Sequence, residues 1–211
     1  MVDVHQHRRR VEAAHAVAAL TAGERPGAAG QCVVDVARDR SARLVHVDVI
    51  RSVPGLPIER RLAVIAAGIR AVLEEHTPDV VAVERVFAQH NRHSVMGTAQ
   101  TSGIALLLAA EHGVPAATHT PTEVKAAVTG YGSADKLQVQ TMVARVLRLD
   151  ALPQPADAAD ALALALCHAW RGGAPEASQA TSLTPAQRAW ADAERVSRRE
   201  RVARTNVRSG V

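Results

Sequence analysis

Two sets of acidic residues in this chain could do chemistry, and the first is a single glutamate. Glu84 directly follows the apolar run 80–83, which is β-branched at most positions and predicts a strand buried on both faces. Burying an ionised carboxylate without a partner is costly, so Glu84 needs a metal, a cation or strong hydrogen-bond donors nearby. From this strand alone, an ordinary ion pair with Arg85 or another basic side chain explains the glutamate equally well.

The second set is the pair Asp157 and Asp160, at the start of an apolar segment that predicts a buried helix over 156–170. Residues three apart lie on the same face of a helix, so we expect both carboxylates to point the same way. Capping and the helix dipole would account for them, and suit Asp157 better than Asp160. Alternatively, a divalent cation would relieve the repulsion between two buried acids.

The elements that must position these acids alternate along the chain. The pattern predicts a hairpin of two strands, a helix, the Glu84 strand, a long helix, a short strand and three more helices. We therefore expect an α/β fold, with a mixed sheet flanked by helices. The expected strands cover 32–36, 43–50, 79–84 and 114–118, and the helices cover 57–76, 94–112, 121–128, a segment capped by Ser133, and 156–170.

Composition limits the cellular setting. Apolar residues make up 47% of the chain but aromatic residues only 2%, so the core must consist of Ala, Val, Leu and Ile. The two cysteines, Cys32 and Cys167, form neither a disulfide framework nor a metal-ligand spacing, which favours a reducing cytoplasm. No apolar run approaches the roughly 20 residues that span a bilayer, so we expect no membrane association.

Basic and acidic residues are distributed unevenly along the chain. Residues 1–170 carry 17 basic and 17 acidic side chains, whereas residues 171–211 carry 8 and 4. If the body binds nucleic acid, it must use locally placed cations. We expect three parts: an atypical segment 1–30, disordered or with a short helix over 13–22; a core over 31–170; and a basic tail 171–211, disordered or marginally helical.

Three motifs in the core carry a resemblance to a known family: VAVERVFAQHN at 81–91, TPTEVKAAVTGYGSADKLQVQ at 120–140 and PADAADALALALCHAW at 155–170. Together, in this order and spacing, they resemble the RuvC-type Holliday junction resolvases, which have a ribonuclease-H-like fold. The resemblance covers residues 31 to about 170.

The resemblance implies a structure-selective endonuclease that resolves four-way DNA junctions in recombination and repair. Glu84, Asp157 and Asp160 match the family's catalytic, metal-binding acids, which would hold two Mg²⁺ ions for phosphodiester hydrolysis. Carboxylate ligands suit Mg²⁺ better than imidazole does, so we do not expect His119 or His168 to be ligands.

The resemblance also implies how the DNA is held. Phe87 matches an aromatic residue that stacks on bases at the junction centre, and Lys125 and Lys136 match basic residues along the scissile strand. Without the resemblance, Phe87 would be a packing residue and both lysines solvated. The family acts as a homodimer, for which the helix 94–112 is a plausible interface, and its implied partner is the RuvA–RuvB branch-migration complex.

One family feature is absent. The family begins with a strand carrying a metal-binding aspartate in a Gly-Val-Asp-Pro-Gly-type motif, and here Arg25 stands at that place. Three explanations are open: a frameshifted or misassigned start, which we favour; a degenerate enzyme; or replacement by Asp3 or Asp35. The alternative function is accordingly a catalytically impaired junction-binding protein of the same fold, and a further one is an unrelated α/β enzyme whose acids are structural.

Overall fold

A single mixed sheet organises the part of the chain that the computed structural model describes, namely residues 15–23, 27–85 and 92–171. Its five strands lie in the order β3-β2-β1-β4-β5. β2 is antiparallel to β1 and β3, whereas β4 is parallel to β1 and β5. The strands are β1 (His15–Ala22), β2 (Ala28–Val36), β3 (Ala42–Arg51), β4 (Val80–Glu84) and β5 (Ala116–His119).

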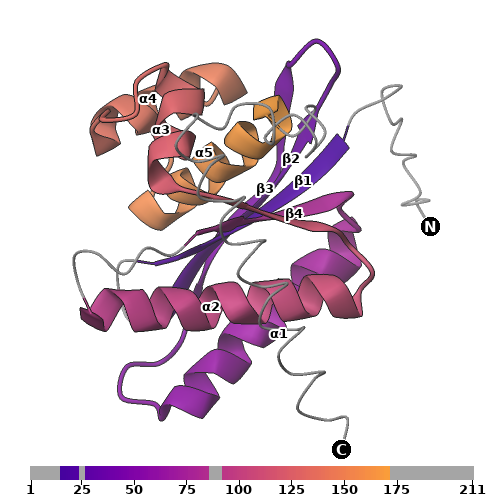
Figure 1. Cartoon of the computed structure of the whole chain (residues 1–211), viewed down its shortest axis with the longest axis vertical. Coiled ribbons are helices and arrows are strands. Elements are labelled where there is room, and N and C mark those ends of the chain that lie inside the picture. Colours follow the sequence, from indigo (N-terminus) through magenta and orange to yellow (C-terminus); the bar gives the residue numbers. More distant parts are fainter. Residues whose placement is uncertain (1–14, 24–26, 86–91, 172–211) are drawn as a thin grey trace, which may run out of the picture. The chain divides into compact units, whose positions relative to one another are not determined.

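Helices cover both faces of this sheet (Figure 1). α1 (Ile58–His76) and α2 (Arg92–Glu111) pack on one face, over a core that includes Ile69, Val81 and Leu108. α3 (Pro121–Thr129), α4 (Lys136–Leu147) and α5 (Ala156–Arg171) lie on the other face, around a second core cluster that includes Val34 of β2 and Leu162 of α5. The predicted α/β architecture is confirmed.

The central strand β1 corrects our expectation for the N-terminal segment. We predicted a short helix over 13–22, but His15–Ala22 is a strand paired on both sides, with Val17 to Thr21 buried. Alanine and leucine favour helix locally, but pairing with β2 and β4 supplies two ladders of hydrogen bonds that override this preference. Strand β2 also begins at Ala28, before the expected core boundary.

Local signals account for most of the remaining elements. The predicted hairpin is confirmed, with Ala37 and Ser41 hydrogen-bonded across its turn. Thr120 caps α3 in a reciprocal capping box, ahead of the predicted Pro121. The predicted cap Ser133 is wrong, because Asp135 forms the capping box of α4 with Gln138. Among the helices that the structure describes, none is long and apolar enough to cross a membrane.

Candidate active site

Glu84 ends β4 and lies largely buried beneath α5. Strand β4 is short and its middle residues are fully buried. Glu84 is the last residue of this strand and therefore lies at the edge of the core. Burial and the nearby charge of Asp160 raise the pKa of Glu84 from 4.5 to about 7. Arg85, the neighbouring candidate for an ion pair with Glu84, donates hydrogen bonds from its guanidinium to the Thr118 hydroxyl, at 3.0 and 3.3 Å.

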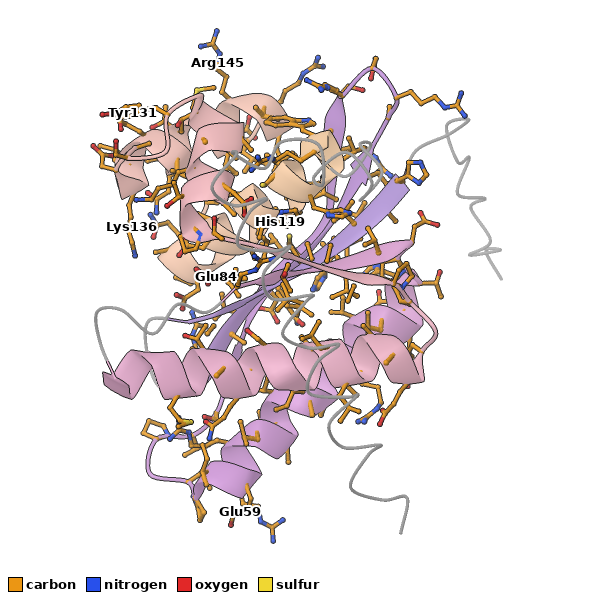
Figure 2. All side chains as sticks on the ribbon, viewed as in Figure 1. Glu59, Glu84, His119, Tyr131, Lys136 and Arg145 are labelled. Atoms are coloured by element: carbon orange, nitrogen blue, oxygen red, sulfur yellow. The ribbon has the colours of Figure 1, made fainter. Side chains whose placement is uncertain are left out.

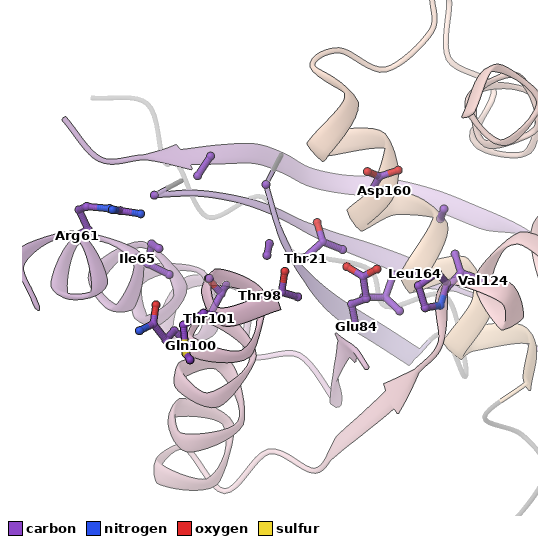
Figure 3. A pocket seen from close by; sticks show the side chains of 18 of the residues that line it. Thr21, Arg61, Ile65, Glu84, Thr98, Gln100, Thr101, Val124, Asp160 and Leu164 are labelled. Carbon is purple, nitrogen blue, oxygen red and sulfur yellow. The ribbon is translucent and has the colours of Figure 1, made fainter. Parts of the chain in front are cut away.

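Asp160 faces Glu84 from the second turn of α5 (Figure 3). Desolvation raises the pKa of Asp160, and the neighbouring charge of Asp157 raises it further. Lys136 and Lys125 act in the opposite direction, so both lysines lie within electrostatic reach of this carboxylate. Glu84, Asp160 and the two lysines thus lie around one cavity, and their roles in catalysis and DNA binding remain predictions.

Asp157 is close enough to Asp160 for its charge to act on that carboxylate, but it is not among the residues that line the site with Glu84. It is buried, with only 9% of its surface exposed, and its carboxylate is directed at the end of β1, where a Cβ added to Gly23 would come within 2.7 Å of its Oδ2. Its backbone carbonyl accepts a hydrogen bond from the Thr21 hydroxyl at 3.5 Å. Asp157 and Asp160 thus leave the same end of α5 and lie beside different neighbours, and their shared role in metal binding remains a prediction.

Thr21 is the site residue that the sequence did not reveal. The parallel register pairs Leu20 of β1 with Val83 of β4, so the next residues along, Thr21 and Glu84, lie side by side. Thr21 is 3% exposed, and Figure 3 shows its side chain beside those of Glu84 and Asp160. The only sequence signal was a hydroxyl residue at the end of the apolar run 16–20, which is weak.

The proposed substitutes for the missing aspartate can now be placed. Asp35 pairs with Ala16, at the opposite end of β1 from Thr21, and its carboxylate binds Arg43 at 2.6 Å. Five residues of strand separate it from the site by about 17 Å, so Asp35 is excluded as a substitute. Asp3 and Arg25 lie outside the described residues, as does Phe87.

The acids line a cavity of about 940 Å³ that continues past Thr21 to α1 and the start of α2. Its walls are apolar except for a few polar and basic side chains, and Figure 3 shows Arg61 and Gln100 at the end away from Asp160. The lining includes Thr21, Ile58, Arg61, Leu62, Ile65, Glu84, Met96, Thr98, Gln100, Thr101, Val124, Lys125, Lys136, Asp160 and Leu164.

The donor chemistry fits a hard divalent cation at Glu84 and Asp160. Mg²⁺ is commonly held by one or two carboxylates together with water and phosphate oxygens, and a cation between these two acids would offset their mutual repulsion. Within the described part of the chain, no cluster of three or more acidic, histidine or cysteine side chains is arranged to hold a metal. Asp157 as a third ligand remains a prediction.

Two histidines near the site are engaged with each other. His119, which pairs with Glu84 across β4 and β5, lies within hydrogen-bond distance of His168 on α5, with Nε2 and Nδ1 separated by 3.0 Å. Burial lowers the pKa of His168 to about 4 and also lowers that of His119. In Figure 2, Glu84 and His119 lie close together between the two helical layers. This pair links β5 to α5.

Comparison with known proteins gives a consistent result. Residues 22–168 match the family model "Crossover junction endodeoxyribonuclease RuvC". Proteins of that name from Leifsonia xyli and Paenarthrobacter aurescens are 58% and 57% identical to the chain, covering 79% and 80% of it and 86% and 90% of their own lengths.

Solved structures agree with the sequence comparison. Thermus thermophilus RuvC in complex with a Holliday junction substrate superposes with a TM-score of 0.69 at 35% identity, covering 75% of this chain and 94% of that one. A second structure of Thermus thermophilus RuvC gives a TM-score of 0.68, also at 35% identity. The fold is therefore the ribonuclease-H-like fold that the motifs implied, and the chain belongs to the RuvC family of crossover junction endodeoxyribonucleases.

Proposed function

We propose that this protein is a metal-dependent endonuclease that cleaves four-way DNA junctions in recombination and repair. The observation that carries the proposal is the meeting of Glu84 and Asp160 in one cavity with Lys125 and Lys136 close to Asp160. Buried acids beside lysines suit the metal-dependent cleavage of a phosphodiester, because the acids hold cations and the lysines attract phosphates.

Each side chain has a distinct task in this proposal. Lys125 on α3 and Lys136 on α4 bind phosphates of the scissile strand and hold it along the cavity. Glu84, Asp157 and Asp160 hold Mg²⁺. A bound Mg²⁺ would lower the pKa of a water molecule and stabilise the leaving oxygen. Two ions per site are expected from the family resemblance.

The proposal also includes the oligomeric state of the protein and its partner complex. We expect a homodimer that uses α2, because Met96 and Leu107 leave 62% and 58% of their surfaces exposed there. A RuvA–RuvB branch-migration complex is the expected partner. Strands β1 and β2 place residues 15–22 and 28–30 in the sheet of the core, although the predicted division put them in a segment 1–30 outside the core 31–170. The basic tail 171–211, the stacking role of Phe87 and the cytoplasmic location remain predictions.

A second candidate function, junction binding with impaired cleavage, is favoured by Thr21. A neutral hydroxyl lies beside Glu84 where a further carboxylate would strengthen the binding of cations. The two candidates share the fold and the DNA-binding lysines and differ only in how well the site holds metal.

One experiment separates these candidates. A labelled synthetic four-way junction and a duplex of the same length are titrated with protein in Ca²⁺, and cleavage is then started with Mg²⁺. The nuclease proposal predicts preferential junction binding followed by paired nicks. Preferential binding without nicks supports the impaired protein, and equal binding of junction and duplex contradicts both.

A further inference from the structure

The end of the cavity that lies away from the acids contains a basic side chain to which neither the motifs nor the family resemblance gave a role. Arg61 projects from the first turns of α1 into the wall formed with Ile58, Leu62 and Ile65. Figure 3 shows it across the cavity from Asp160. Lys125 and Lys136 stand at the acidic end, so a strand lying through the cavity would meet basic groups at both ends.

Arg61 lacks partners among the residues that the structure describes. Its Nε is buried and makes no hydrogen bond, and no carboxylate forms an ion pair with its guanidinium. A buried donor without a partner costs free energy, and a charged one costs more. This cost would be removed by an anionic acceptor.

Neighbouring backbone fixes the guanidinium without satisfying it. Gly27 lies so close that an added Cβ would be 3.0 Å from the Arg61 Nε. The Gly27 carbonyl is already occupied, because it accepts hydrogen bonds from both the backbone N–H and the hydroxyl of Ser52, at 2.9 and 3.0 Å. The Arg61 Nε therefore lies close to this turn without a hydrogen bond to it, and the donor stays available for a ligand.

We infer that Arg61 binds a backbone phosphate of the DNA strand at the end of the cavity opposite Lys125 and Lys136. The guanidinium offers a planar set of N–H donors that matches two phosphate oxygens, and the apolar surroundings strengthen the charge-assisted hydrogen bonds. The inference rests on the proposed function, and it adds a phosphate contact from α1 to those from α3 and α4.

Salt dependence of DNA binding tests the inference. Each phosphate contact contributes about one to the slope of log affinity against log salt concentration, so Arg61→Gln should reduce that slope by about one and weaken junction binding roughly 5- to 20-fold. Arg61→Lys, which keeps the charge, should retain most of the slope. The control is Arg60→Gln, since Arg60 is exposed on the same helix and does not line the cavity.

Thermal unfolding of the free protein separates this role from a structural one. Removing a half-buried guanidinium whose Nε has no partner should leave the midpoint temperature of Arg61→Gln equal to or above that of the wild type. The inference is overturned if Arg61→Gln binds the junction with the slope and affinity of the wild type. It is also overturned if Arg61→Gln loses affinity only because the variant is unfolded at the assay temperature. If the wild type binds junction and duplex equally, the proposed function fails, but the slope on either DNA still decides the role of Arg61.

Discussion

At the scale of single residues, the electrostatic cost of holding Glu84 beside Asp160 should be visible in stability. The Glu84 carboxyl ionises near 4.5 in an unfolded chain and near 7 in the folded protein. The folded state therefore keeps this proton while the unfolded state loses it, so the contribution of Glu84 to stability is greatest below pH 4.5 and falls as the pH rises to 7.

Glu84→Gln should abolish that loss. Without divalent ions at pH 8, we expect the variant to be more stable than the wild type by on the order of 2 kcal/mol, with little difference at pH 4.5. Urea unfolding at both pH values measures this. Glu111→Gln is the control, because Glu111 lies in an exposed ion pair with Arg70. A Glu84→Gln variant less stable than the wild type at pH 8 would contradict the electrostatic account.

Thr21 allows a second test at this scale. Thr21→Asp adds a carboxylate beside Glu84, so we expect lower stability in a chelator, a larger increase in midpoint temperature on adding Mg²⁺, and a rise in junction cleavage of about tenfold or more. Thr21→Asn has nearly the same shape without the charge and should show none of these effects. Equal responses of the two variants to Mg²⁺ would show that Thr21 does not border the cation site.

These residues also show what the sequence could reveal. Glu84 and Asp160 could be predicted because each interrupts an apolar run, which is a local signal. Thr21 could not, because its importance comes from pairing with β4, more than 50 residues away in the chain. Asp157 and Asp160 lie beside different neighbours because of how α5 packs against β1 and β2. Helical periodicity in the sequence does not predict that packing.

At the scale of elements, the start of α5 is set by its close approach to β2. A Cβ on Gly30 would lie 2.1 Å from the backbone oxygen of Asp157, so any side chain there must push the helix away from the sheet. We expect Gly30→Ala to destabilise the fold by about 2 kcal/mol and to shift Asp160 away from Glu84. Chemical unfolding gives the first effect, and a reduced Mg²⁺-induced rise in midpoint temperature gives the second.

Gly97→Ala in α2 is the matched control for this change, because an added Cβ there meets nothing within 4 Å. It should be neutral or stabilise the protein by up to about 1 kcal/mol, as alanine favours helix. Unchanged stability in Gly30→Ala would mean that α5 tolerates displacement and that its register does not position the acids.

Elements with strong local patterns were predicted well. α1 repeats buried apolar residues at helical spacing. Its C-cap is Thr77, whose backbone N–H donates a hydrogen bond to the Leu73 carbonyl and which directly precedes a proline. β1 was mistaken for a helix because its alanines carry no strand signal, and its burial comes from neighbours on both sides. The sequence therefore predicts the elements that have a clear local pattern. It does not predict a strand such as β1, which is stabilised by pairing with strands distant in the chain.

At the scale of the whole molecule, α2 gives the prediction for assembly. Leu107 is 58% exposed on this helix, and its nearby glycine, Gly103, leaves open space for close approach of another surface. Leu107→Asp should convert a dimer to a monomer, measured by light scattering after gel filtration. Leu137→Asp, an equally exposed leucine on α4, should leave the mass unchanged. A wild-type mass of one chain would contradict the expected homodimer.

The most direct test of the nuclease site compares the nicking rate of a synthetic four-way junction by the wild type, Asp160→Asn and Asp150→Asn in Mg²⁺. Asp150 is exposed and does not line the cavity, so its variant controls for loss of a negative charge. We predict that the wild type and Asp150→Asn nick the junction at similar rates, whereas Asp160→Asn binds it but nicks at least about 100-fold more slowly. Nicking by Asp160→Asn at the wild-type rate would contradict a catalytic site at Glu84 and Asp160.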